Sequence, residues 1–344
     1  RQCVETIDGP VLVLAGAGTG KTKAITMRMA YMISRGIAPE AIAAMTFTNK
    51  AAREMVERLE SLVGEKTATK VKLGTFHSFC LSILREYGER IGLAKKFSLA
   101  GTSDQIDLLR RALQEEAALT AINAEVLHAE ISRAKNALLK PSDFAKRAIH
   151  ISIGLEPELL VKAYELYERQ LKLNRMIDFD DCIFKAVCLL EEFPEVRAQL
   201  ENRYRYFMVD EFQDTNAAQF RVLELLGTGH NNVCAVGDDD QSIYSWRGAL
   251  FETLERFEKM FPGTRLIKLE QNYRCTNVIL DAANTVIKNN TRRKEKTLWS
   301  ANDGSWPIEV SALPSEEEEA RFIATRCMSF MGEGFRAGDI AVLY

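Results

Sequence analysis

The stretch VLVLAGAGTGKT at residues 11–22 decides the fold of this 344-residue chain. Its first five residues, Val11 to Ala15, form an uninterrupted apolar run that predicts a buried strand. A glycine-rich turn follows, and a helical pattern begins at Lys21 and continues to Ser34. A strand, a glycine-rich turn and a helix in this order are the setting in which phosphate-binding loops occur.

The turn has the composition that an anion-binding loop needs. Small residues let several backbone N–H groups face one phosphate, and the start of the following helix adds positive potential. We expect Lys21 to hold the β- and γ-phosphates of ATP and Thr22 to ligate Mg²⁺. Ala15 stands where the pattern usually has glycine, which an L residue tolerates if its φ is negative. The residues expected to bind the nucleotide here are Ala15, Gly16, Ala17, Gly18, Thr19, Gly20, Lys21 and Thr22.

Apolar runs and helical segments continue to alternate outward from this loop. Further strands are predicted at 42–47, 71–75, 206–210, 233–237 and 265–269, and further helices at 49–63, 76–87 and 277–288. Because these runs lack polar alternation and are separated by helices, they indicate an α/β fold with a parallel sheet covered on both faces. From about residue 88 to 200 the pattern is helical without a convincing strand, which predicts a helical insertion. From about residue 306 a second strand–helix–strand series begins, with a strand at 340–344.

One of the later apolar runs ends in two carboxylates, Asp210 and Glu211. A strand tip beside the phosphate loop is where a metal-holding aspartate belongs, so we expect Asp210 to coordinate Mg²⁺, mostly through water. Glu211 is then placed to orient and deprotonate the attacking water. Alone, the pair fits an ordinary solvated turn equally well; the phosphate loop favours the catalytic interpretation.

Two further polar segments follow apolar runs. Gln241 ends the segment VGDDDQ at 236–241, and we expect it to contact the γ-phosphate or the attacking water. The three acids at 238–240 fit a metal cluster, but helix caps and surface charge explain them about as well. Arg274 could neutralise charge that develops near the γ-phosphate, although spacing alone favours a surface arginine.

Composition sets outer limits on the class of protein. The net charge is −3 with 27% charged residues, so overall charge does not point to nucleic acid, although a local basic groove can still follow a strand. The seven cysteines include no CxxC pair, which favours reduced thiols in a cytoplasmic protein and disfavours a zinc site. We find neither a membrane-length apolar run nor a signal peptide. The initial Arg1 and the strand-like end at 340–344 suggest a piece of a longer protein.

Seven stretches together carry a family pattern. They are AGAGTGKT (15–22), TFTNKAAREM (46–55), GTFHSF (74–79), DFDD (178–181), VDEFQDTN (209–216), VGDDDQSIYSWRGA (236–249) and LEQNYR (269–274). The chain therefore resembles the UvrD/Rep/PcrA family of superfamily-one DNA helicases, and within it looks closest to the Rep branch. The stretches extend over nearly the whole chain in the family's order, and DEFQDT with GDDDQSIYSWRGA is highly specific.

The resemblance implies both an architecture and an activity. Residues 1–76 and 200–268 would form a RecA-like domain 1A, 77–199 a helical insertion 1B, and 269–344 the first part of a second RecA-like domain 2A. The implied activity is that of an ATP-dependent translocase and helicase on single-stranded DNA, moving 3′ to 5′ with Mg-ATP hydrolysis, in replication or repair. Single-stranded DNA, its junctions with duplex, and replication or repair proteins are the implied partners, whereas the oligomeric state is not indicated. We expect this portion alone to unwind little or no DNA.

The resemblance also assigns roles to individual residues. Gln2 would read the adenine, Tyr273 would stack on it, and Arg274 would act as an arginine finger. Lys23 stands where the family usually has arginine packed against the base, and lysine has no guanidinium plane to stack. Phe47, Phe179, Tyr244 and Trp246 would flank or stack on DNA bases, and Thr46, Asn49, Thr75, His77 and Arg247 would contact the DNA backbone or base edges.

Other functions fit parts of the pattern. Within the enzymes, the alternatives are a translocase that strips proteins from DNA and the motor part of a helicase–nuclease. A non-catalytic DNA-binding or scaffold module could keep the fold, but intact Lys21, Asp210, Glu211 and Arg274 argue against it. A P-loop kinase or metabolic ATPase has no use for the aromatic residues in the loop at 236–249.

Overall fold

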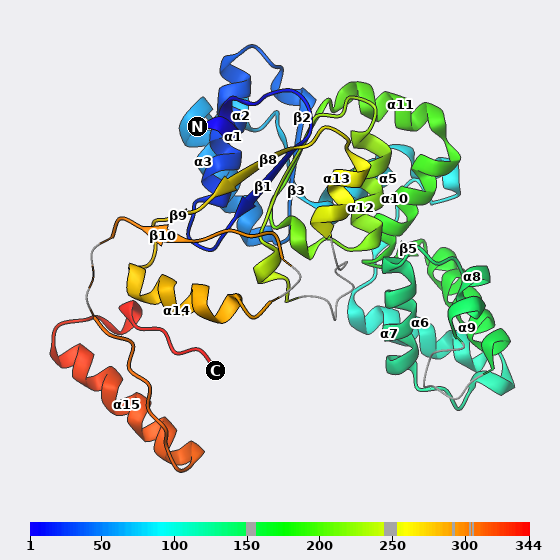
Figure 1. The fold of residues 1–344 in the computed structure, drawn as a ribbon. Coiled ribbons are helices and arrows are strands. Elements are labelled where there is room, and N and C mark those ends of the chain that lie inside the picture. The colour runs from blue at the N-terminus through cyan, green and yellow to red at the C-terminus, as the bar shows by residue number, and fades with distance from the viewer. Residues whose placement is uncertain (149–155, 244–252, 291–292, 303, 305) are drawn as a thin grey trace.

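The computed structural model describes residues 1–148, 156–243, 253–290, 293–302, 304 and 306–344, and its centre is a six-stranded parallel sheet (Figure 1). The strand order is β3-β2-β6-β7-β1-β8, and every neighbouring pair runs parallel. The strands are β1 (Val11–Ala15), β2 (Ile42–Thr46), β3 (Lys72–Thr75), β6 (Tyr206–Val209), β7 (Val233–Gly237) and β8 (Arg265–Leu269). All six predicted strands are confirmed, three with the predicted bounds and three one residue shorter.

The helices surround this sheet and extend beyond it. They are α1 (Gln2–Glu5), α2 (Lys21–Ser34), α3 (Asn49–Val63), α4 (Glu65–Ala68), α5 (Phe76–Tyr87), α6 (Thr102–Gln114), α7 (Ala124–Asn136), α8 (Pro141–Ala148), α9 (Pro157–Leu173), α10 (Asp181–Glu192), α11 (Pro194–Arg203), α12 (Ala217–Gly227), α13 (Thr253–Met260), α14 (Asn277–Ile287) and α15 (Glu316–Gly332). Among the described residues, no helix combines the length and apolar character needed to cross a membrane.

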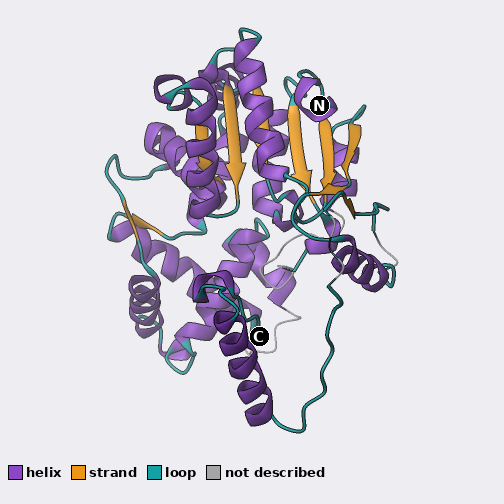
Figure 2. Cartoon of the chain, turned by 90° about the vertical axis from the view of Figure 1, so that its left-hand side faces the viewer, coloured by secondary structure: helices purple, strands orange, loops and turns teal. Residues whose placement is uncertain are grey.

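The sheet is buried on both faces because successive side chains of a strand point to opposite sides. Along β1, Leu12 and Leu14 pack into one core with helices α5 and α10 to α13. Val11 and Val13 pack into a second core with α2 and α3. Figure 2 shows the strands with helices on both sides. This two-sided burial explains why the inner strands β1, β2, β6 and β7 read as continuous apolar runs, whereas the edge strand β8 has exposed residues.

The helical insertion has a core of its own. Helices α6 to α9 pack around a third cluster that includes Leu109, Leu127 and Tyr167, and they lie together beside the sheet domain (Figure 1). Helices α5, α10 and α11 instead contribute to the core on the sheet. The separate helical core is thus narrower than the predicted range 77–199, and the division into domains stays a prediction.

The expectation of no strand between residues 88 and 200 is wrong at one place. The two-residue strands β4 (Ser98–Leu99) and β5 (Met176–Ile177) pair in parallel. Such short segments carry too few residues to show a period-2 pattern in the sequence. Their pairing places the turn that follows β5 next to the start of α6.

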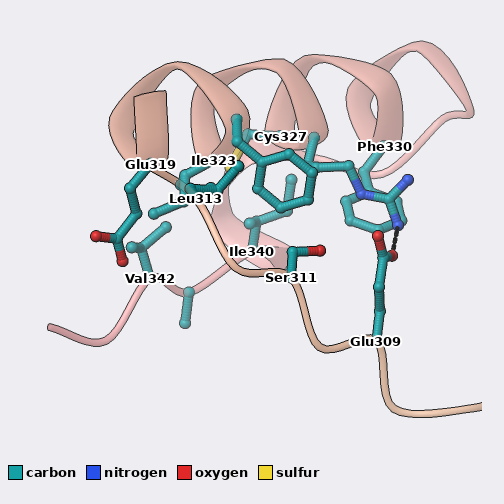
Figure 3. Close-up of a pocket in the computed structure, with 12 residues that line it drawn as sticks. Glu309, Ser311, Leu313, Glu319, Ile323, Cys327, Phe330, Ile340 and Val342 are labelled. Carbon is teal, nitrogen blue, oxygen red and sulfur yellow. Dashed lines mark hydrogen bonds and ion pairs between the residues drawn. The ribbon is translucent and has the colours of Figure 1, made fainter. Parts of the chain in front are cut away.

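The C-terminal region is only partly as predicted. A short parallel pair joins β9 (Gln271–Asn272) to β10 (Trp299–Ser300), and α14 and α15 form. The strands predicted from about residue 306 and at 340–344 are wrong, because these segments have no ladder of hydrogen bonds with any described segment. They border a hollow of about 560 Å³ under α15 (Figure 3), which none of the predicted site residues lines.

Candidate active site

One edge of the sheet collects the predicted site residues. In a parallel sheet all strands end at the same edge, and β6, β7, β1 and β8 are consecutive neighbours. The segments that follow these four strands contain the phosphate loop, the acidic pair, Gln241 and Arg274. Residues nearly two hundred positions apart in the chain therefore meet at this edge.

The loop after β1 has the backbone shape that its glycines allow. Gly18 and Gly20 have φ values of +73° and +86°, which L side chains rarely adopt. Ala15 is the last residue of β1 and is not among the residues with positive φ, so alanine is tolerated there. Lys21, the first residue of α2, is 8% exposed.

The acidic pair contacts this loop directly. Thr22 Oγ1 donates a hydrogen bond to Asp210 Oδ2 over 2.9 Å, and Lys21 Nζ lies 2.6 Å from Glu211 Oε2. Asp210 is 3% exposed; burial, with the neighbouring Glu211 charge, raises its pKa to about 6. The predicted convergence of the phosphate loop and the acidic pair is confirmed.

Glu211 has an unusual backbone conformation. Its φ and ψ are 50° and 46°, in the left-handed region that costs a residue with a Cβ about 1–2 kcal/mol. Two hydrogen bonds hold it there: Glu211 N donates to Asp210 Oδ1 over 3.0 Å, and Asp214 N donates to Glu211 O over 3.0 Å. Backbone strain of this kind concentrates at functional sites, where it fixes the direction of a side chain.

Gln213 is a site residue that we did not predict. Its side chain is buried, and Nε2 donates to Glu211 Oε2 over 2.8 Å while Oε1 accepts from Asp238 N over 2.9 Å. Asp238 Oδ2 in turn accepts from Gln241 Nε2 over 2.5 Å. Gln213 thus links the tips of β6 and β7, and Gln241 is joined to Glu211 through two intermediates. Its place in the DEFQDT stretch was the only sequence signal.

The three acids at 238–240 surround a buried lysine. Lys296 Nζ lies 2.6 Å from an oxygen of Asp238, 2.8 Å from Asp239 and 2.6 Å from Asp240, and its side chain is 2% exposed. Asp238 also caps the turn, because Oδ1 accepts from Asp240 N over 3.1 Å. The interpretation as a cap is confirmed for Asp238, and surface charge is not the explanation. The three acids lie close enough together to hold an ion, so a metal cluster stays a prediction. Lys296 was also not predicted, because its partners lie more than fifty residues away.

The segment after β8 packs on the phosphate loop. Asn272 Nδ2 donates to Ala17 O over 2.6 Å, and Tyr273 N donates to Gly18 O over 2.9 Å. A Cβ at Gly18 would lie 2.8 Å from Arg274 Cβ, so glycine is required for this approach as well as for φ. The predicted residues Tyr273 and Arg274 are both exposed beside the loop. Their contacts with a nucleotide stay a prediction.

The helix that begins at Gln2 is held against α2 by a buried arginine. Arg28 of α2 is 2% exposed and donates to Cys3 O over 2.7 Å, to Ile7 O over 3.0 Å and to Thr6 O. These bonds anchor α1 on α2. The side chains of Gln2 and Lys23 are exposed, so both are accessible to a ligand, and the predicted contacts with adenine stay untested.

The oxygen atoms near Thr22 suit a magnesium ion. Mg²⁺ prefers oxygen ligands from one or two carboxylates, completed by water and phosphate. The Thr22 hydroxyl and the Asp210 carboxylate lie at hydrogen-bond distance from each other. Asp214 Oδ1, from the same acidic turn, is buried and has no hydrogen-bond partner in the described part of the chain. This donor set fits the predicted metal.

Four of the predicted DNA contacts lie at the same edge of the sheet, at the ends of β2 and β3 or shortly after β2. Thr46 and Thr75 are paired in register at the strand ends, and they are 1% and 8% exposed. Thr75 Oγ1 accepts from Ser78 N over 3.2 Å and caps α5. Asn49 is exposed, whereas Phe47 is half-buried. The two threonine side chains are therefore covered in this structure, and contact with DNA stays a prediction for all four predicted residues.

His77 and Phe179 form one aromatic unit. Their ring centroids are 3.9 Å apart with the planes at 20°, and Phe179 is 54% exposed. Burial lowers the pKa of His77 to about 4, so the ring is neutral at neutral pH. This stack offers a flat, uncharged surface of the type that binds bases. Tyr244, Trp246 and Arg247 lie outside the described residues.

Two family models cover the chain. The UvrD/REP helicase N-terminal domain matches residues 1–262, and the UvrD-like helicase C-terminal domain matches residues 267–344. The first match alone spans the phosphate loop, the acidic pair and Gln241. The second contains Arg274 and Lys296.

Similar proteins carry the name "ATP-dependent DNA helicase PcrA". The protein of that name from Staphylococcus aureus is 41% identical to this chain, and that from Staphylococcus epidermidis is 40% identical. Each alignment covers 100% of this chain and 47% of the relative, so the chain spans about half the length of these curated relatives. The expectation of a closest likeness to the Rep branch stays a prediction.

Proposed function

The chain belongs to the UvrD/REP helicase family, and we propose that it supplies the ATP-hydrolysing part of a motor that moves along single-stranded DNA and unwinds duplex. The observation that carries this proposal is the meeting of the phosphate loop with the acidic pair. Lys21 lies 2.6 Å from Glu211, and Thr22 lies 2.9 Å from Asp210. These are the side chains that a phosphoryl-transfer site needs at one place.

We assign the steps of hydrolysis to four side chains. Lys21 and the start of α2 bind the β- and γ-phosphates. Thr22 and Asp210 would hold Mg²⁺, which would neutralise phosphate charge. Glu211 then has to leave Lys21 so that its carboxylate orients the attacking water and accepts a proton from it. As water adds to the γ-phosphorus, the bond to the β,γ-bridging oxygen breaks.

The second substrate is single-stranded DNA. Phe179, stacked on His77, is an exposed aromatic face, and base stacking on such a face contributes about 1–3 kcal/mol per base. Asn49 is an exposed donor at the first residue of α3, after the neighbouring strand β2. Because DNA contacts and nucleotide contacts follow strands of the same sheet, a change at the acidic turn can reach the DNA surface over a short path.

The sensing of ATP is assigned to Gln241 and Arg274. Gln241 is tied to Asp238, which Gln213 links to Glu211, so loss of the γ-phosphate can be transmitted to the loop at 236–249. Arg274 is exposed next to Gly18 and can reach toward a γ-phosphate. Adenine recognition by Gln2 and Tyr273, with Lys23 nearby, completes the proposed site.

The remaining parts of the proposal come from the family likeness. They are movement from 3′ to 5′, a preference for junctions of single-stranded and duplex DNA, and partners in replication or repair. The intact Lys21, Asp210 and Glu211 favour a catalytic motor over a scaffold that merely keeps the fold.

Strand displacement by the complete protein tests this function. A duplex with a 3′ single-stranded tail and one with a 5′ tail are each incubated with protein, ATP and Mg²⁺. We expect displacement of the 3′-tailed substrate and none without ATP. ATP hydrolysis without displacement of either duplex would favour a translocase that does not unwind. The absence of both ATP hydrolysis and strand displacement would refute the proposal.

A further inference from the structure

The turn that carries Phe179 is bound by two residues at the C-terminal end of α7. Lys135 Nζ lies 2.6 Å from Asp178 Oδ2 and 2.8 Å from Asp181 Oδ1, and the Lys135 side chain is fully buried. The next residue, Asn136, donates through Nδ2 to Asp180 Oδ1 over 2.9 Å. Two consecutive residues of α7 therefore bind all three acids of the turn at 178–181.

Phe179 is the exposed member of this turn. Asp178 and Asp181 are 2% and 0% exposed, whereas Phe179 is 54% exposed and stacks on His77. Because its chain neighbours are fixed by charged and polar contacts, the position of the Phe179 ring follows the position of α7. A movement of α7 relative to the sheet would move the ring.

Asn136 also contacts the start of α12, in the segment that follows the acidic pair. Its Oδ1 accepts from Asn216 Nδ2 over 2.6 Å, a contact between residues 80 positions apart. Asn216 is 7% exposed and caps α12, because its Oδ1 accepts from Gln219 N over 2.9 Å. It lies five residues after Glu211, and the intervening short helix Phe212–Asp214 makes that segment compact.

One side chain thus joins the segment that follows the acidic pair to the turn that carries Phe179. An asparagine amide offers a donor and an acceptor at its tip, and both are used here between different parts of the chain. Asn136 also donates to Ser132 O over 2.9 Å, the carbonyl one turn earlier in α7, which fixes its rotamer. Asn136 therefore connects Asn216 to Asp180, the residue next to Phe179.

We propose that Asn136 is a positioning residue that couples the acidic turn of the nucleotide site, through Asn216, to the DNA-stacking face of Phe179. The inference rests on the proposed function, since it requires that Phe179 stacks on DNA. Asn136 lies outside the seven family stretches and connects two of them, 178–181 and 209–216. Lys135 serves as the fixed anchor of the same turn, and the polar link through Asn136 carries the coupling.

The test compares ATP turnover with and without single-stranded DNA in the complete protein. Asn136→Ala removes both contacts. Asn216→Ser removes the donor to Asn136 but keeps a hydroxyl that can cap α12, because serine is a good N-cap residue. Asn174→Ala is the control, because Asn174 makes the same bond to the carbonyl one turn back, Gln170 O at 2.8 Å, on the exposed end of α9.

We expect turnover without DNA to stay within about twofold of wild type in all three variants. The stimulation by single-stranded DNA should fall about fivefold or more in Asn136→Ala and in Asn216→Ser, the size of a typical coupling between two sites. The double variant should be no worse than the more affected single variant, since both substitutions break one link. Asn174→Ala should keep full stimulation.

Wild-type stimulation in both Asn136→Ala and Asn216→Ser would overturn the inference. If Asn136→Ala lowers the melting temperature, Asn216→Ser alone decides between the outcomes. Loss of stimulation in parallel with loss of basal turnover would indicate a merely structural role and would also overturn it. A wild-type protein that single-stranded DNA does not stimulate would instead refute the proposed function, which separates the two failures.

Discussion

Gln213 donates its side-chain amide to Glu211 Oε2 over 2.8 Å, within a chain of contacts that runs from Lys21 to Lys296. Lys21 pairs with the same Glu211 oxygen, Gln213 accepts from the Asp238 backbone, and Asp238 pairs with Lys296. The carboxylate assigned to activate water is therefore held on two sides. When Lys21 turns to a phosphate, Gln213 is the contact that keeps Glu211 in place.

Gln213→Ala should lower the turnover number for ATP without a comparable change in KM. Loss of a hydrogen bond to a charged group costs about 1.5–3 kcal/mol, which corresponds to a step that is about 10- to 150-fold slower. Steady-state hydrolysis measures both constants. Gln199→Ala serves as the control because Gln199 is exposed and its side chain contacts Tyr87. A KM effect alone would show that Gln213 acts in binding.

Phe179→Ala should weaken the binding of single-stranded DNA and leave ATP affinity unchanged. Removal of one stacking face costs about 1–3 kcal/mol, or about five- to 150-fold in Kd. Fluorescence anisotropy with a labelled oligonucleotide gives this value. Phe335→Ala is a matched control, since Phe335 is also 54% exposed and lies far along the chain after α15. If the two variants bind single-stranded DNA with equal affinity, Phe179 does not stack on DNA.

Lys296→Met should destabilise the protein strongly. Lys296 pairs with three carboxylates at 238–240, of which Asp240 also pairs with Arg293, and breaking a buried ion pair on one side costs about 3–5 kcal/mol because the remaining charges stay buried. Urea denaturation measures the free energy of unfolding. The same substitution at the exposed Lys288 should change it by less than about 0.5 kcal/mol. If Lys296→Met changes the free energy of unfolding only slightly, other groups must balance the charge of the three carboxylates.

His77 should make the stability depend on pH below about 6.5. Burial lowers its pKa in the folded state to about 4 from the ordinary 6.5, so the unfolded chain binds a proton first. This contribution to the free energy of unfolding is present in full above pH 6.5. It is lost as the pH falls from 6.5 toward 4.

The difference between wild type and His77→Gln isolates this effect. Asp210 and Asp214, whose pKa values burial raises to about 6, act in the opposite direction and are common to both proteins. Denaturation at pH 7 and pH 5 should show a loss for wild type relative to His77→Gln. If the free energy of unfolding changes equally in both proteins between pH 7 and pH 5, burial does not lower the pKa of His77.

The inner strands of the sheet were predictable because they are apolar on both sides, unlike the edge strand β8, which has exposed residues. Val11 to Ala15 has no exposed residue to break the run, and the same holds for β2 and β7. The meeting of Lys21 with Glu211 followed from the motifs, since each lies in the segment that follows a buried strand. The paired two-residue strands β4 and β5 left no pattern, and the predicted strand at 340–344 lacks a described neighbour to pair with.

The supporting residues were not predictable in the same way. Gln213, Asn272 and Lys296 act through partners at the tips of other strands, and a polar side chain at such a position carries no periodic signal. Asn272, for example, binds Ala17 O across 255 positions of the chain. Only the three-dimensional arrangement shows which carbonyl or carboxylate such a side chain reaches. The same holds for Asn136 and Asn216.

The central claim is that Lys21 and the acidic pair of Asp210 and Glu211 act on one triphosphate. Its most direct test is the rate of Mg-ATP hydrolysis by Lys21→Ala in the complete protein with saturating single-stranded DNA. We predict a fall of at least about a hundredfold relative to wild type, the effect of losing a charge-stabilising contact in the transition state. Turnover within about twofold of wild type would contradict the account.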